Sequence, residues 1–138
     1  MAAVLLSGLV LAGSPALAQA PAPNPVATVE LAEVIILRVR DPGPWPSVYA
    51  RAEEIYRRLN EVVQQGPQQV AAQAVAVAPG GGGYVVSVGD RVIATVTRQD
   101  ARLNGTTPQA LARLWAANLR SALASFVALH ARPAPPVL

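Results

Sequence analysis

The strongest constraint on the fold is a long amphipathic segment near the carboxyl terminus. Thr107 is a good helix cap, Pro108 suits the first turn, and apolar residues then recur at helical spacing to about residue 129. The residues of this apolar face are Leu111, Trp115, Leu119, Ala122 and Phe126. A helix with one apolar face is stable only when another element covers that face. The sequence therefore predicts a packed domain in which this helix lies against a second layer.

That second layer is predicted to be a β-sheet, because several segments alternate apolar and other residues as a half-buried strand requires. These segments are residues 34–40, the run around Val75 and Val77, residues 84–88 and residues 91–97. Gly89 and Asp90 separate the last two segments and suit a type II′ turn. The sequence therefore predicts a hairpin there, with Val86 opposite Ile93.

Further helices are predicted between and after these strands. Ser47 can cap an amphipathic helix over residues 48–63, whose Glu and Arg residues are spaced one turn apart on the solvent side. Thr97 and Asp100 have the spacing of a capping box, which predicts a short helix before the long one. The expected order is β-α-β-β-β-α-α. This is an α+β fold, with a mostly antiparallel sheet and two amphipathic helices packed on one face.

Proline and small apolar residues divide the chain into its expected parts. Residues 1–20 contain an apolar stretch followed by small residues at the spacing that a signal peptidase recognises, with cleavage after Ala18 or Ala20. An uncleaved membrane anchor is the alternative. After the signal peptide we expect a Pro-rich linker over residues 21–33, a single α+β domain over 34–130 and a Pro-rich tail over 131–138. The protein is thus predicted to be exported, periplasmic or extracellular, with no transmembrane span in the mature chain.

Residue types that commonly perform catalysis or bind metals are scarce or have a local structural explanation. The chain has no cysteine, which excludes disulfides and thiolate metal sites. Its one histidine, His130, lies at a helix end without a nearby carboxylate, and the tract from Gly80 to Gly83 lacks the Lys and Ser or Thr of a phosphate loop. Glu53 and Glu54 are adjacent on a helix, so their side chains diverge. We therefore predict no catalytic residue, no cofactor and no metal site, and interpret the glycine tract as a hairpin connection.

Aromatic side chains outside the predicted core are the best candidates for a partner-binding surface. Trp45 stands in a Pro-rich turn, where its ring can either cover the edge of the core or make an exposed contact. Tyr49 and Tyr56 lie two turns apart on the flank of the following helix. A few aromatic rings contribute much of the energy of many interfaces. Trp45, Tyr49 and Tyr56 are therefore predicted to bind a partner.

Two segments also carry a family resemblance. RAEEIYRRL, from Arg51 to Leu59, and VSVGDRVIATVTRQDARLNGTTPQALARLWAANLRSAL, from Val86 to Leu123, resemble the amino-terminal extracytoplasmic domain of bacterial small-conductance mechanosensitive ion channel family proteins. The resemblance spans roughly residues 34–129 and implies the fold and a sensor or accessory role, with no catalytic or ligand residue carried over. No apolar run of about 20 residues follows, so no pore helix is expected.

The predicted function is that of a non-enzymatic exported domain that acts through protein contacts. An envelope protein or a cell-wall component is the expected partner. The net charge is only +3 and the Arg residues interleave with acidic ones, so nucleic acid is not expected. One alternative is a small-ligand or cell-wall-binding module that uses Arg38, Arg40 and Trp45 at the sheet edge. The other alternative is a truncated channel gene product.

Overall fold

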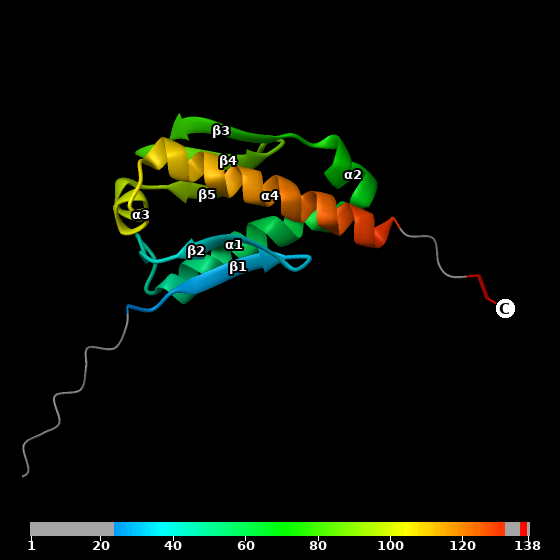
Figure 1. The fold of residues 1–138 in the computed structure, drawn as a ribbon, viewed down its shortest axis with the longest axis horizontal. Coiled ribbons are helices and arrows are strands. Elements are labelled where there is room, and N and C mark those ends of the chain that lie inside the picture. Colours follow the sequence, from blue (N-terminus) through cyan, green and yellow to red (C-terminus); the bar gives the residue numbers. More distant parts are fainter. Residues whose placement is uncertain (1–23, 132–135, 138) are drawn as a thin grey trace, which may run out of the picture.

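The computed structural model describes residues 24–131, 136 and 137, so the predicted signal peptide lies outside the described residues. The elements, in chain order, are β1 (Ala27–Leu31), β2 (Val34–Val39), α1 (Val48–Val63), α2 (Pro67–Ala72), β3 (Val75–Gly80), β4 (Gly83–Val88), β5 (Arg91–Val96), α3 (Arg98–Leu103) and α4 (Pro108–His130) (Figure 1). Helices and antiparallel strands are mixed along the chain. The predicted α+β class is therefore confirmed, with one strand and one short helix more than the sequence indicated.

The described strands form two antiparallel sheets, the hairpin β1-β2 and the three-stranded sheet β3-β4-β5. β1 lies within residues 21–33, so the prediction that this whole segment is a linker was wrong. Ala27 and Val29 are buried while Thr28 and Glu30 are exposed, which is the alternation of a half-buried strand. The turn after β1 consists of Ala32 and Glu33, with φ of 50° and 67°. Because neither residue is a usual turn former, the residues of this turn do not predict a hairpin.

Helices α1 and α4 join the two sheets. α4 packs mainly against β2 of the hairpin and against β3 and β4 of the larger sheet, while α1 packs against β1 and β5. Figure 1 shows α4 crossing the molecule between β3 at one edge and the β1-β2 hairpin at the other. Each helix therefore contacts both sheets, whereas the sequence predicted two helices on one face of a single sheet. The core lies between the helices and both sheets.

The predicted apolar faces of the two long helices are the faces that the core buries. In α4 the buried residues include Leu111, Trp115, Leu119 and Ala122, and Phe126 is half-buried. In α1 they include Val48, Ala52, Ile55, Leu59 and Val62. The caps are also as predicted, since Ser47 Oγ accepts a hydrogen bond from the Ala50 amide and Thr97 with Asp100 forms a complete capping box. Helical period and capping side chains are local properties, which is why the sequence predicts them well.

The glycine tract forms the β3-β4 hairpin, as predicted. Gly81 and Gly82 form its two-residue turn, both with positive φ. A Cβ atom added to Gly83 would lie 2.0 Å from the carbonyl oxygen of Val96, so that position accepts no side chain without a shift of the backbone. The tract therefore has a structural explanation in both the turn and the packing against β5.

The β4-β5 hairpin turns at Gly89 and Asp90, but its predicted register was wrong. Val88 pairs with Arg91 beside the turn, and the register then shifts, so that Val86 faces Ala94 instead of Ile93. A bulge places one extra residue in one strand and moves every later pair by one. Turn residues predict where a hairpin reverses, but they do not predict a bulge further along the strand.

Candidate functional site

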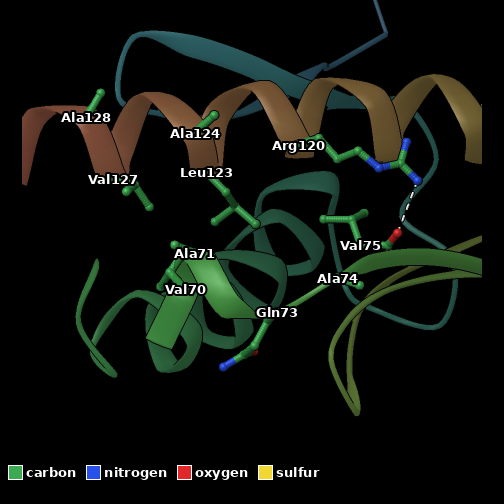
Figure 2. Close-up of a pocket in the computed structure, with 10 residues that line it drawn as sticks. All are labelled: Val70, Ala71, Gln73, Ala74, Val75, Arg120, Leu123, Ala124, Val127 and Ala128. Atoms are coloured by element: carbon green, nitrogen blue, oxygen red, sulfur yellow. Dashed lines mark hydrogen bonds between the residues drawn. The ribbon is translucent and has the colours of Figure 1, made fainter. Parts of the chain in front are cut away.

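An apolar groove of about 550 Å³ lies between α2, the start of β3 and α4 (Figure 2). Its lining residues are Val70, Ala71, Gln73, Ala74, Val75, Arg120, Leu123, Ala124, Val127 and Ala128. Val70 and Leu123 are 2% and 5% exposed and form its floor. Ala124 and Ala128 are exposed on α4, and Ala71 is exposed on α2. The groove is therefore a solvent-open feature whose base belongs to the hydrophobic core.

Short side chains at helical spacing keep this groove open. Ala124 and Ala128 follow one another by one turn on α4, and a methyl group fills little of the space between two packed elements. On the opposite side, α2 is held in place by Val70, which is buried in the core. The Gly89 amide donates a 2.9 Å hydrogen bond to the Ala74 carbonyl, which fixes the chain between α2 and β3. The buried Val70 and this hydrogen bond therefore anchor the α2-β3 side of the groove to the rest of the fold.

Arg120 gives one end of the groove a positive charge. Its guanidinium donates a 3.0 Å hydrogen bond to the carbonyl oxygen of Val75, as Figure 2 shows, and the side chain stays exposed. Neither α2, β3 nor α4 contains Asp or Glu, and Arg120 forms no ion pair with any residue that the structure describes. A single hydrogen bond uses only part of the five donors of an arginine. The remaining donors are available to an anionic group of a ligand.

A second cluster of polar groups is fully enclosed and therefore structural. Arg51 of α1 and Asp100 of α3 form a bidentate ion pair with both N–O distances at 2.7 Å, and the two residues are 3% and 1% exposed. The guanidinium also donates to the carbonyl oxygens of Asp41 and Thr95, at 2.8 Å each. The Thr97 amide donates to the Asp100 carboxylate at 2.9 Å. The ion pair links α1 and α3 to each other, and the guanidinium also ties both to the backbone at Asp41 and Thr95. Because these partners surround both charged groups and bury them, neither group is accessible to a substrate.

The three aromatic residues predicted to bind a partner have different surroundings. Trp45 is half-buried, with the Arg51 guanidinium carbon 5.8 Å from the centroid of its ring. Tyr56 is 38% exposed, and its hydroxyl accepts a 2.9 Å hydrogen bond from the Glu30 amide of β1. Tyr49 is 58% exposed. Trp45 and Tyr56 thus each have a structural contact, and Tyr49 is the most available of the three for a partner.

The residues of the alternative ligand site lie at the end of β2 and in the turn after it. Arg38 and Arg40 are both exposed, as a ligand site would require. The ring of Trp45, however, contacts the guanidinium of Arg51 in the enclosed cluster. The alternative ligand site instead combines Trp45 with Arg38 and Arg40.

The described residues contain no group of three or more His, Cys, Asp or Glu that could hold a metal ion. His130 has the helix-end role predicted for it: its ring packs against Phe126 at 4.2 Å between centroids with the two planes tilted by 36°, and its Nδ1 lies 2.9 Å from the Phe126 carbonyl oxygen. None of the helices between residues 24 and 131 combines the length and the apolar composition that crossing a membrane requires.

The groove itself was not predicted from the sequence. Its residues come from three elements, and seven of the ten are Ala or Val, which form no recognisable motif. Only the spacing of Arg120, Ala124 and Ala128 on one side of α4, next to its apolar face, indicates a distinct surface.

One family model matches residues 28–126, and its description is "Domain of unknown function (DUF8459)". The match covers well over half of the chain, so the chain belongs to this family. No curated protein and no solved structure matches it. The matched region begins inside β1, so the family domain includes most of this strand, which lies in the segment predicted to be a linker. The family description names no activity, and the resemblance to channel-associated domains stays a prediction.

Proposed function

We propose that this member of the DUF8459 family is a non-enzymatic binding module that acts through protein contacts, and that the groove between α2, β3 and α4 is where a partner binds. The observation that carries the proposal is an open apolar groove, of a size typical of ligand sites, with one arginine at its end. Aliphatic walls provide affinity through burial, and one charged group provides orientation.

The chemistry of the lining supports binding more than catalysis. Apart from Arg120 and Gln73, every lining residue is Ala, Val or Leu. An arginine stays protonated and cannot act as a general base at physiological pH, and a glutamine amide does not titrate. The groove can therefore hold and orient a ligand.

The proposal places this binding in the cell envelope. That location rests on the signal peptide predicted in residues 1–20, and an accessory role beside a channel rests on the resemblance of residues 34–129. The envelope location and the accessory role are therefore parts of this proposal, as is binding at the groove. A partner in the same compartment would present an extended or helical apolar segment to α4.

Photocrosslinking in living cells tests the groove directly. An amino acid with a compact diazirine side chain, no bulkier than leucine, replaces Ala71 or Ala128, both exposed residues that line the groove, and in a control strain it replaces Ala110, which is exposed on α4 outside the groove. We expect a covalent protein adduct of one defined mass from the groove positions and none from Ala110. Equal adducts from all three positions, or none from any, would contradict the proposal. Native mass spectrometry that finds a small apolar molecule in place of a protein would support the small-ligand alternative instead.

A further inference from the structure

Strand β3 is an uncapped edge of the larger sheet. It pairs with β4 on one side, and no strand among the described residues pairs with its other side. Figure 1 shows it along the outer border of the molecule. Its sequence, Val-Ala-Val-Ala-Pro-Gly, contains no charged residue, and Ala76, Ala78 and Pro79 are exposed. Edge strands usually carry charges or coverings that prevent pairing with another chain, so this edge is open to strand addition.

The register of the hairpin tells which backbone groups face that edge. In an antiparallel pair, hydrogen-bonded and non-hydrogen-bonded residue pairs alternate. Ala74 accepts a hydrogen bond from the Gly89 amide on the β4 side, and Gly80 pairs with Gly83 beside the turn. The alternate residues between them, Ala76 and Ala78, therefore bond to β4. It follows that Val75, Val77 and Pro79 direct their backbone groups outward, and only Pro79 lacks an N–H.

The other edge strands, β1, β2 and β5, each have a backbone group that is hydrogen-bonded to a side chain of a helix. The Tyr56 hydroxyl accepts from the Glu30 amide in β1, the Asn118 side chain donates to the Ile36 carbonyl in β2 at 3.0 Å, and Arg51 donates to the Thr95 carbonyl in β5. Helix side chains thus bind the backbone of each of these strands. On β3 the corresponding contact is the bond from Arg120 to Val75, at the end of the strand that adjoins the groove. The rest of the β3 edge is left for a partner.

Resting on the proposed function, we infer that the groove and the β3 edge together bind the carboxyl terminus of an extended peptide. The peptide adds antiparallel to β3, its terminal carboxylate lies at Arg120, and its last apolar side chain enters the groove. The direction follows from the layout, because Val75, Arg120 and the groove all lie at the amino-terminal end of β3. A strand whose carboxyl terminus ends there runs opposite to β3.

Charge and hydrogen bonding favour this occupant over others. The unused N–H groups of Arg120 and the outward amide of Val75 are donors that a carboxylate accepts well. No acidic residue of α2, β3 or α4 competes for them. A fatty acid would use the arginine and the apolar groove but leave the outward backbone groups of Val77 without a partner. A peptide uses all three features, which is the pattern of strand addition combined with capture of a terminal carboxylate.

Fluorescence anisotropy with the full-length protein tests this inference. The probes are a pool of fluorescein-labelled hexapeptides that end in Val, Leu, Ile or Phe with a free carboxylate, and the same pool with carboxyl-terminal amides. We expect the carboxylate pool to bind about tenfold more tightly or better, as a charge-assisted hydrogen bond predicts. Arg120→Gln should remove this preference, whereas the matched control Arg102→Gln, at an exposed arginine of α3, should keep it. Equal binding of both pools by the unchanged protein would overturn the inference.

Two further variants separate strand addition from groove binding. Val77→Pro removes an outward N–H without touching the bonds to β4, and it should weaken both pools roughly tenfold. Ala124→Trp fills the groove and should abolish binding of both pools. If Ala124→Trp abolishes binding while Val77→Pro and Arg120→Gln have no effect, the groove function stands and the strand-addition inference fails. Binding of dodecanoate that depends on Arg120, with no binding of either pool, would replace the peptide by a fatty acid. Circular dichroism spectra identical to the parent's show that each variant is folded.

Discussion

Replacing Arg51 by Ala should destabilise the domain by about 3 to 5 kcal/mol, the cost of removing one member of a buried ion pair. The substitution leaves the Asp100 carboxylate, which is 1% exposed, without its bidentate partner. It also leaves the carbonyl oxygens of Asp41 and Thr95 without the hydrogen bonds that the guanidinium donates to them. One amide bond, from Thr97, remains to the carboxylate. An unpaired buried charge is among the most destabilising changes a small domain can undergo.

The assay is urea denaturation followed by circular dichroism, with Arg57→Ala as the control. Arg57 lies on the same helix and bonds to Glu54 and Glu61, but its side chain is 57% exposed. Solvent screening makes such surface pairs weak, so this variant should unfold at nearly the same urea concentration as the parent. The comparison separates the effect of burial from the loss of an arginine on α1.

A third variant tests whether the cost comes from the unpaired charge. In Arg51→Met with Asp100→Leu, both charges are absent and apolar side chains occupy the space. This double variant should be more stable than Arg51→Ala, because replacing a buried pair by apolar groups is far less costly than breaking it. If Arg51→Ala costs less than about 1 kcal/mol, as an exposed pair would, or if the double variant is the least stable of the set, the reasoning is refuted.

Three other expectations are open to the same kind of measurement. Trp115→Ala should cost about 3 to 5 kcal/mol, because the indole is 3% exposed and its loss leaves a cavity; an unchanged urea midpoint would show that the ring is not in the core. Hydrogen bonds chiefly from Arg57 lower the pKa of Glu54 from its ordinary 4.5 to about 2. Solvent screening keeps the stabilisation from this carboxylate small; it is fully present above pH 4.5 and lost as the pH falls toward 2, so the urea midpoint should decline slightly more over that range in the parent than in Glu54→Gln. Finally, Trp45→Ala with Tyr49→Ala should keep the circular dichroism spectrum and abolish partner capture if the aromatic residues form the contact, whereas a folded variant that still captures its partner favours the groove.

The elements that the sequence predicted correctly are those whose signals are local. In α4 the Thr107 cap, the proline after it and the helical spacing of apolar residues lie within one continuous segment. The glycine tract likewise contains its own turn. These features depend on backbone conformation and on neighbours a few positions away, so the order of residues within the segment is enough to predict them.

The elements that the sequence missed depend on contacts between distant segments. The β1-β2 turn at Ala32 and Glu33 has a backbone conformation that neither residue favours, and Ser125 of α4 donates a 3.2 Å hydrogen bond to the Ala32 carbonyl. The bulge in β4-β5 likewise has no signature in its own residues. The contact to the Ala32 turn comes from a residue 93 positions away, and neither the turn nor the bulge can be recognised from the residues of its own segment.

The candidate sites show the same division most clearly. By itself, the sequence determined that the chain has amphipathic helices, alternating strands and few residues suited to catalysis. Only the tertiary structure decided that Arg51 meets Asp100 across 49 positions, and that small residues of α2, β3 and α4 enclose a groove with Arg120 at its end. The physical reason is that helix and turn formation depend on local backbone preferences, whereas an ion pair or a groove depends on which surfaces meet when the core closes.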